Sequence, residues 1–462
     1  NGIGPEIMDS ALRILKELKA PLEYEIVDVG EDVYLKGNKT GITDEAWESI
    51  FRTKVFFKAP ITTPQGGGYK SINVTFRAAL GLFANIRPVR SYFPYVQTDH
   101  PEIDLIIVRE NEEDLYSGIE YQTSPDSVQS IKLVTRQGCE RIIRYAFELA
   151  KSQSRKKVTC FTKDNIMKLT DGLFHNVFDE ISKEYKDVQS EHQIIDIGSA
   201  RLADTPEKFD VIVTTNLYGD IISDIAAQIS GSVGLAGSSN IGANGSMFEA
   251  IHGSAPDIAG KGIANPSGLI NGAILMLQHL GFNENASVLE NALLLTIEDG
   301  IHTGDIYSPE KSKIKVGTIG FTDALIDRLG KKSIHFKERA QSKPIKINNV
   351  STSHSPEQTI IGMDVFVVDS TTDSEELSKK ITSILPKDFE LKFIANRGNL
   401  VWPKRFSSSS LSDLWRCRIF SNKTSQPDYF EALSGLAKSG INISKVENLY
   451  KFDGKEGFSS LS

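Results

Sequence analysis

The stretch FDVIVTTNLYGDIISDIAAQ, residues 209–228, joins the two patterns that decide the fold. Its first half is a short β-branched run, and its second half has the apolar spacing of a helix, with Asp220 and Asp224 one turn apart. A strand that leads directly into a helix is the repeating unit of layered α/β proteins. The stretch therefore predicts a helix that begins just past a strand end and carries two carboxylates near its start.

The same alternation extends over about the first 330 residues. Helical patterns such as 136–151 and 171–185 separate further β-branched runs. These runs are YEIVDV (24–29), KVFFKAP (54–60), DLIIVRE (104–110), KVTCFTK (157–163) and QIIDIG (193–198). We expect an α/β fold with a partly parallel sheet.

The chain changes character after Gly330. Residues 331–358 are basic at first and then rich in Ser, Asn and Thr without an apolar period, which predicts a linker. Residues 359–462 read β-α-ββ-β-α-β in outline. This order predicts a small ferredoxin-like α+β unit at the C-terminal end.

Composition excludes several classes of protein. A net charge of −8 over 462 residues argues against nucleic acid or a membrane surface as the main partner. No apolar run reaches the length of a membrane span. Cys139, Cys160 and Cys417 are odd in number and share no metal-type spacing, which fits a reducing compartment. We expect a cytoplasmic location in a bacterium, or the mitochondrial matrix in a eukaryote.

A first cluster of candidate site residues is polar and basic. Ser71 stands at the expected N-terminus of a helix after three glycines, and Asn73 and Arg77 are four residues apart and so share one face of that helix. Arg87 and Arg109 add two guanidiniums on strand-like runs. Such a set suits a substrate with two or three carboxylates, although each residue alone could be an ordinary surface residue.

A second cluster is acidic. Asp220 and Asp224 would repel each other unless a cation lies between them, and hard oxygen ligands of this kind suit Mg²⁺ or Mn²⁺. The alternative is that they only complement the helix dipole. Asp196, which we expect at another strand end, is a candidate third ligand.

Two further features could carry chemistry. Lys163 at a strand end could accept a proton, and Tyr116 lies in the polar run RENEEDLYSG. The glycine-rich loop EAIHGSAPDIAGKGIANP (249–266) does not match the GxGxxG fingerprint, but its small residues could enclose a flat base.

Together these motifs resemble the β-decarboxylating dehydrogenases, the isocitrate/isopropylmalate dehydrogenase family. The resemblance runs in family order from residue 1 to about 330, and IANRGNLVW, RCRIF and FDGKEGF extend it into a C-terminal domain similar to that of long bacterial isocitrate dehydrogenases of the Thermus and Rickettsia type. The matching motifs are NGIGPE (1–6), TTPQGGGYKSINVTFR (62–77), NIRPVR (85–90), VRENEEDLYSGIE (108–120), TKDNIMKLTDG (162–172), NLYGDIISD (216–224) and HGSAPDIAGKGIANP (252–266).

The resemblance implies a layered α/β fold with a large domain (1–88 and 210–330), a small domain (89–209), a linker (331–358) and a ferredoxin-like C-terminal domain (359–462). The family turn usually follows a strand, so we expect that a first strand of the large domain is missing before Asn1.

The resemblance also implies a role for each candidate residue. Lys163 and Tyr116 would be the catalytic base and acid, and the metal ligands would be Asp196, Asp220 and Asp224. The isocitrate carboxylates would be bound by Ser71, Asn73, Arg77, Arg87 and Arg109. Thr63 would lie near the nicotinamide, and the ribose and adenine pocket would be lined by Glu249, His252, Asp257, Ile258 and Asn265.

The implied activity is the oxidative decarboxylation of isocitrate to 2-oxoglutarate and CO₂ with Mg²⁺ or Mn²⁺, a step of the citric acid cycle. It implies a homodimer in which Lys163 and Asp196 act in the other subunit's site. An acid at Asp257, followed by Ile258, would repel a 2′-phosphate, so we expect NAD, with NADP as the alternative.

Alternatives to isocitrate dehydrogenase are family members that act on isopropylmalate, homoisocitrate or tartrate, or a non-catalytic regulatory subunit. Ser71 and Asn73 argue against isopropylmalate, because an isopropyl group would leave both polar groups unpaired.

Overall fold

The computed structural model describes residues 2–62, 71–339, 345, 355–404 and 410–460. The chain divides into two compact units, Asn1–Ser117 with Leu133–Val350, and Gly118–Lys132 with Ser351–Ser462. Each is described by itself below.

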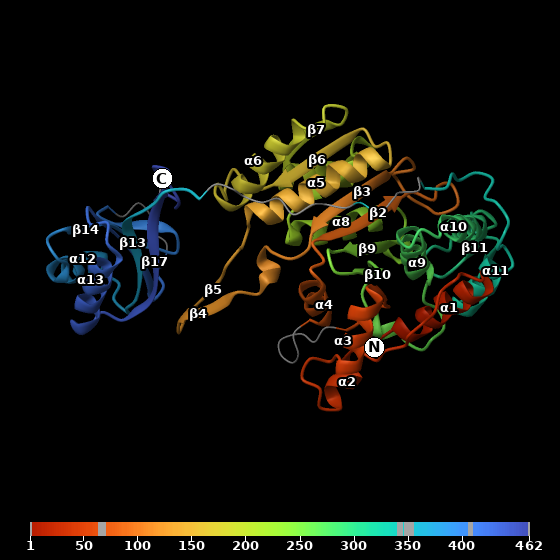
Figure 1. Cartoon of the computed structure of the whole chain (residues 1–462), viewed down its shortest axis with the longest axis horizontal. Helices are drawn as coiled ribbons and strands as arrows, with labels where there is room; N and C mark the ends of the chain where they lie inside the picture. The colour runs from red at the N-terminus through yellow and green to blue at the C-terminus, as the bar shows by residue number, and fades with distance from the viewer. Residues whose placement is uncertain (1, 63–70, 340–344, 346–354, 405–409, 461–462) are drawn as a thin grey trace. The chain divides into compact units, whose positions relative to one another are not determined.

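A mixed sheet of eight strands is the centre of the first unit (Figure 1). The pairs β3–β8, β8–β6 and β6–β7 are parallel, while β2 is antiparallel to both of its neighbours. In spatial order the strands are β1 (Val55–Phe57), β10 (Ser246–Ala250), β9 (Gly237–Ile241), β2 (Ala84–Arg90), β3 (Asp104–Glu110), β8 (Val211–Thr214), β6 (Lys157–Thr162) and β7 (Gln189–Ile194).

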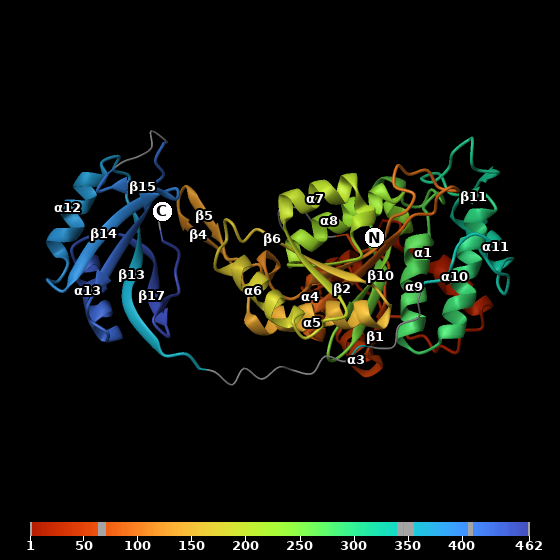
Figure 2. The same cartoon turned by 90° about the horizontal axis from the view of Figure 1, so that it is seen from above.

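Helices cover both faces of this sheet. Ile106 and Val108 of β3 pack against α5 (Arg136–Ser152) and α6 (Thr170–Ser182), whereas Leu105 and Ile107 pack on the opposite side with residues of α7 (Ile195–Asp204) and α8 (Asn216–Ile229). Figure 2 shows these two helix pairs on either side of the strands. Burial of both faces explains why the central strands are continuous apolar runs.

The remaining elements of the first unit surround its other end. One apolar core joins α1, α9, α10 and α11, and a smaller one joins α3, α4 and β1. The bounds are α1 (Gly4–Glu17), α2 (Glu31–Leu35), α3 (Asp44–Thr53), α4 (Ile72–Leu80), α9 (Ser267–His279), α10 (Asn283–Glu298), α11 (Thr318–Ile326), β11 (Ile301–His302) and β12 (Ile314–Lys315), with the short helices η1 (Leu115–Ser117), η2 (Pro206–Lys208), η3 (Val233–Leu235) and η4 (Pro256–Ile258).

The second unit is an antiparallel sheet with two helices and a hairpin. Its strand order is β15-β14-β16-β13-β17-β18, so the four long strands have the order of a ferredoxin-like fold, as predicted. The hairpin β4 (Glu120–Ser124) and β5 (Ser127–Ser130) belongs to the same unit. The other bounds are β13 (Gln358–Val368), α12 (Ser374–Ile384), β14 (Phe389–Asn396), β15 (Asn399–Trp402), β16 (Leu414–Ser421), α13 (Gln426–Lys438), β17 (Ile443–Phe452) and β18 (Lys455–Glu456).

Two strand predictions are wrong in detail. Residues 24–29 form no strand; only Val29 makes a single bridge, to Ile42, and Ile26 is 84% exposed, so the apolar alternation has no sheet to pack on. The run 193–198 is divided, because β7 ends at Ile194 and α7 begins at Ile195. Asp196 therefore lies just past the end of β7, in the first turn of α7.

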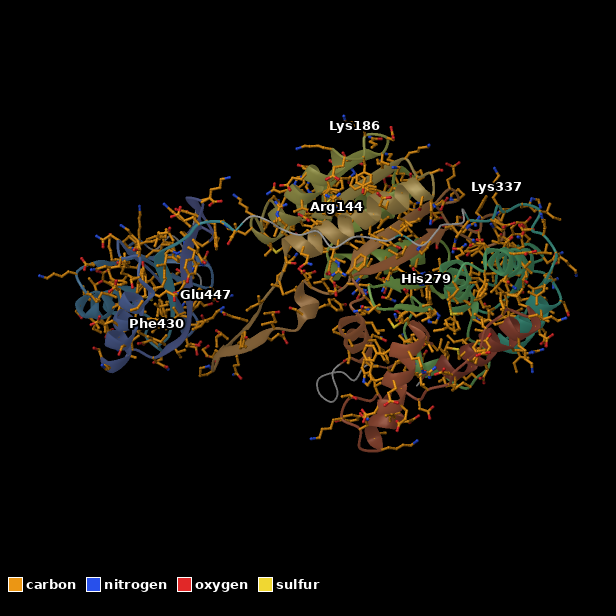
Figure 3. All side chains as sticks on the ribbon, in the orientation of Figure 1. Arg144, Lys186, His279, Lys337, Phe430 and Glu447 are labelled. Atoms are coloured by element: carbon orange, nitrogen blue, oxygen red, sulfur yellow. The ribbon has the colours of Figure 1, made fainter. Side chains whose placement is uncertain are left out.

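The division of the first 330 residues into a large domain (1–88 and 210–330) and a small domain (89–209) stays a prediction. Strands from all three ranges belong to the one eight-stranded sheet. Among the described residues, the helices are too short or too polar to span a membrane. Charged side chains such as Lys186 and Lys337 extend from the surface (Figure 3).

Candidate functional site

A cavity of about 210 Å³ in the first unit collects most of the predicted site residues. Four cationic side chains line it against two carboxylates, which leaves a surplus of two positive charges. The polar and charged lining residues are Lys58, Ser71, Asn73, Arg77, Arg87, Arg109, Tyr116, Asp220, Glu249 and His252. The cavity is therefore suited to an anion of more than one charge.

Three arginines from different elements converge on this cavity. Arg109, only 1% exposed, donates to the backbone oxygen of Asn216 at 2.9 Å and also pairs with Asp220. Arg87 donates to Ser223 Oγ at 2.6 Å and to Asp220 Oδ1 at 3.2 Å. Burial lowers the pKa of Arg109, and the like charge of Arg87 adds to the effect. The arginines are thus held rigidly, in a place where an anion would relieve their mutual repulsion.

Gly219, in the first turn of α8, makes room for Arg109. A Cβ atom on Gly219 would come within 2.5 Å of Arg109 Cγ, so α8 could not approach β3 this closely with a larger residue. This contact fixes the guanidinium next to Asp220.

The predicted substrate helix α4 presents unused hydrogen-bonding groups. Asn73 Oδ1 and Arg77 Nε are buried, and neither has a hydrogen-bond partner among the described residues. Burying such atoms without partners is costly. Ser71 stands at the N-cap position of α4. The unpaired atoms of Asn73 and Arg77 support a polar ligand beside α4.

Sequence reasoning missed a buried network that supports the arginines. Arg87 Nε donates to Asn85 Oδ1 at 2.6 Å, Asn85 donates to Asn240 at 2.8 Å, and Asn240 donates to Glu249 at 2.8 Å. Glu249 also pairs with Lys58. The only signal for Lys58 was a lysine within an apolar run, and Asn240 gave none, because β9 reaches β2 only through the fold.

The Glu249 carboxylate is already bonded to Lys58 and Asn240, so it is not free to contact a ligand. Burial opposes its ionisation, but Lys58 and Arg77 outweigh that effect and lower the pKa of Glu249 to about 2. It is therefore charged at neutral pH and balances two cations of the cavity.

Tyr116 contacts Asp220, the first of the two carboxylates of α8. The Tyr116 hydroxyl donates to Asp220 Oδ2, and burial together with this bond raises the pKa of Tyr116. Burial opposes ionisation of Asp220, but Arg109 and Arg87 prevail and lower its pKa. Burial raises the pKa of Asp224, whose side chain is still 62% exposed. Carboxylate oxygens one turn apart are a donor set that fits Mg²⁺ or Mn²⁺.

Lys163 and Asp196 form a pair that does not line this cavity. Lys163 Nζ donates to Asp196 Oδ1 at 2.8 Å, and the Asp196 side chain is 68% exposed. The backbone N–H of Lys163 donates to Asp171 Oδ2 at 2.6 Å, which fixes the loop after β6. Within one chain, Tyr116 and Asp220 line the cavity, Asp224 lies next to it at 3.4 Å from Arg87, and Lys163 and Asp196 form a separate pair.

The predicted cofactor loop is tied to the N-terminal turn. Ile3 N–H donates to Ser254 O at 2.8 Å, and Glu6 Oε1 accepts from Ala264 N–H at 3.2 Å and from Thr318 Oγ1 at 3.1 Å. Gly2 has φ +55, and a Cβ there would lie 1.9 Å from Ser254 O. The turn and the loop therefore form one structural element at the edge of the cavity.

The loop itself offers groups for a nucleotide. His252 Nε2 is buried without a partner among the described residues, and burial lowers the pKa of His252, so its imidazole is neutral at pH 7. Asn265 donates to Asp305 Oδ2 at 2.9 Å. Asp257 and Ile258 lie in the single turn of η4. Thr63 lies outside the described residues.

Comparison with known proteins covers nearly the whole chain. Residues 1–325 match the family described as isocitrate/isopropylmalate dehydrogenase, and residues 358–462 match the bacterial isocitrate dehydrogenase C-terminal domain. Isocitrate dehydrogenase (NADP) of Rickettsia bellii is 51% identical over 99% of this chain and 96% of its own length.

The similarity to more distant relatives also covers nearly the whole chain. The enzyme of that name from Thermus thermophilus is 40% identical over 99% of this chain and 93% of its own length. A solved protein of Thermus thermophilus superposes with a TM-score of 0.94 at 39% identity, over 99% of this chain and 94% of that one.

The prediction that Asp257 and Ile258 select NAD is wrong. The names of the relatives from Rickettsia and Thermus, which are 40% to 52% identical to this chain, specify NADP. The physical reason is exposure: the Asp257 side chain lies in solvent, where its charge is screened, and Lys261 is exposed four residues later in the same loop. An acid at this place does not by itself exclude a 2′-phosphate.

Proposed function

The chain belongs to the isocitrate/isopropylmalate dehydrogenase family, and we propose that it catalyses the oxidative decarboxylation of isocitrate to 2-oxoglutarate and CO₂ with NADP⁺. The observation that carries the proposal is the cationic cavity, in which Arg77, Arg87 and Arg109 converge beside buried polar atoms that lack partners among the described residues. A tricarboxylate supplies the negative charge and the hydrogen-bond acceptors that the guanidiniums, including the Arg77 Nε–H, require.

The polarity of α4 favours isocitrate over isopropylmalate. The substituent that distinguishes the two substrates would lie at Ser71 and Asn73, where isocitrate offers a carboxylate and isopropylmalate an alkyl group. An alkyl group would leave the Arg77 Nε–H buried and unpaired, at a cost of about 1–3 kcal/mol, whereas a carboxylate oxygen can accept from it.

Asp220 and Asp224, with Asp196 of a second chain, would hold the divalent metal. Bound Mg²⁺ or Mn²⁺ would polarise the C2 oxygen of isocitrate and lower the pKa of its hydroxyl, and bound NADP⁺ would accept the hydride from C2. Asp220 is suited to this place because Arg109 and Arg87 keep it ionised.

Lys163 and Tyr116 would move the protons of the reaction. Lys163 takes the proton of the C2 hydroxyl as the hydride leaves C2, which gives a β-keto acid. The C–C bond to the central carboxylate then breaks, CO₂ departs with the carbon framework keeping the electron pair, and Tyr116 returns a proton to C3. Tyr116 can supply this proton because its hydroxyl is protonated at neutral pH and the residue lines the cavity beside Asp220.

A symmetric dimer would complete the site. Lys163 and Asp196 pair with each other away from the cavity of their own chain, and both are accessible. Two-fold symmetry would present this pair to the partner's cavity and the partner's pair to this one. A non-catalytic role is less well supported, since Tyr116, Lys163 and all three aspartates are present. The cytoplasmic location stays a prediction.

With isocitrate and Mg²⁺, we expect kcat/KM for NADP⁺ to exceed that for NAD⁺ by at least about tenfold, because a charged hydrogen bond to the 2′-phosphate contributes about 1.5–3 kcal/mol. We assign this contact to Lys261. Initial rates with both cofactors test it, and Lys261→Ala should reduce the advantage of NADP⁺ while leaving NAD⁺ rates unchanged. The control is Lys332→Ala, which removes an exposed lysine elsewhere. Equal or higher kcat/KM for NAD⁺ in the wild-type protein would refute the preference for NADP⁺, and an unchanged preference in Lys261→Ala would refute the role of Lys261.

A further inference from the structure

A second cluster of potential metal ligands lies at one edge of the first unit. Asp164 follows β6, His175 lies on α6, and His192 lies on β7, the strand that pairs with β6 (Figure 1). One ligand atom from each of the three lies within 4.8 Å of the others. None of the three residues has a place in the proposed catalytic reaction.

The two imidazoles face the same carboxylate. His175 Nδ1 lies 2.7 Å from Asp164 Oδ2, and His192 Nε2 lies 4.0 Å from Asp164 Oδ1. The rings are stacked, with centroids 3.5 Å apart and planes 17° from parallel. Two histidines held this closely would repel each other if both were protonated. In this arrangement the His175 Nδ1–H donates to the Asp164 carboxylate, so a cation that binds here takes the place of that proton.

The three side chains lie near the surface, where a cation can reach them. The side chains of His175, His192 and Asp164 are 24%, 17% and 22% exposed, so an ion and a water ligand can enter. Burial, reinforced by His175, lowers the pKa of His192. Thr162 Oγ1 lies 2.7 Å from His192 Nε2 and can turn away when that nitrogen coordinates a cation.

We propose that Asp164, His175 and His192 form a binding site for a late first-row divalent cation such as Zn²⁺, with water as the fourth ligand. Two imidazoles and one carboxylate select this class of ion over Mg²⁺, which prefers oxygen ligands alone. Binding requires one imidazole to rotate about its Cβ–Cγ bond, because a metal must lie close to both ring planes. The bound ion would connect β6, α6 and β7.

Such an ion would hold the segment that carries Lys163. Asp164 is the next residue, and His192 is four residues before Asp196. The site would therefore fix both ends of the Lys163–Asp196 pair without using either residue as a ligand.

The test is a Co²⁺ titration of the full-length, chelator-treated protein in a large excess of Mg²⁺, which occupies all-oxygen sites. Four-coordinate Co²⁺ with nitrogen ligands absorbs visible light strongly, whereas octahedral Co²⁺ with oxygen ligands absorbs weakly. We expect strong absorption that saturates at one equivalent per chain and is displaced by Zn²⁺. His175→Gln and His192→Gln should each abolish it.

His100→Gln, which removes a histidine distant in the sequence, should retain the full signal. Thermal unfolding without added metal checks that each variant is folded, and His192→Asn gives a second variant at that ligand. Weak absorption in the folded wild-type protein, or strong absorption that survives in folded His192→Gln and His192→Asn, would overturn the proposal.

Discussion

Replacing Arg109 by Gln is expected to lower kcat/KM for isocitrate by about 10³-fold. Arg109 is the most buried of the three arginines and also pairs with Asp220. Its loss leaves a substrate carboxylate, which becomes buried on binding, without one of its cations, and breaking a buried ion pair in this way costs about 3–5 kcal/mol, or roughly one factor of ten per 1.4 kcal/mol. Asp220, whose side chain is 34% exposed, also loses a partner. Steady-state rates at saturating Mg²⁺ and cofactor measure the effect.

The matched control is Arg109→Lys, which keeps the charge but not the fork of five donors. It should lose less kcat/KM than Arg109→Gln. Both variants need a thermal unfolding midpoint, because Arg109 also donates to Asn216 and its loss could unfold the start of α8. A folded Arg109→Gln protein whose kcat/KM stays within tenfold of wild type would contradict the role of Arg109 in substrate binding.

Lys163→Met should lower kcat by about 10³-fold with little change in KM, since a general base contributes about 10²–10⁴-fold and Met preserves the length of the side chain. The measurement is kcat and KM for isocitrate. Lys168→Met, an exposed lysine in the same loop, is the matched control and should remain fully active. Full turnover by Lys163→Met would contradict its role as the base.

Mixing the two inactive variants tests whether the site is shared. In a heterodimer of Lys163→Met and Arg109→Gln, one cavity would have Arg109 from its own chain and Lys163 from the partner. Random co-assembly should then restore about a quarter of wild-type activity, because half of the dimers are mixed and each has one complete site out of two. Mixtures that stay inactive would place Lys163 in the site of its own chain.

The layered fold was predictable because its signal is local. Central strands such as β3 and β8 are continuous apolar runs, and the spacing in 209–228 marks the start of α8 next to Asp220. The strand predicted at residues 24–29 was wrong for a physical reason. An apolar alternation indicates that a segment can form a strand, but not that a neighbouring strand is present to pair with it.

The site was predictable only in part. The arginines and Asp220 stood out by charge within the family motifs, and the structure brings them together. Lys58, Asn85 and Asn240 did not stand out, because their role arises from β2, β9 and β10 being neighbours in space. The prediction of NAD was wrong for a similar reason, because the residue type at position 257 does not indicate whether its side chain is exposed.

The most direct test compares kcat/KM for isocitrate and isopropylmalate in the same assay, with NADP⁺ and Mg²⁺, and identifies the product. We predict that isocitrate is preferred by at least about 10³-fold, because a site built for polar groups rejects an analogue that leaves them unpaired. The product should be 2-oxoglutarate, with one CO₂ released for each NADPH formed. Absence of turnover with isocitrate, or an equal or higher kcat/KM for isopropylmalate, would contradict the proposed function.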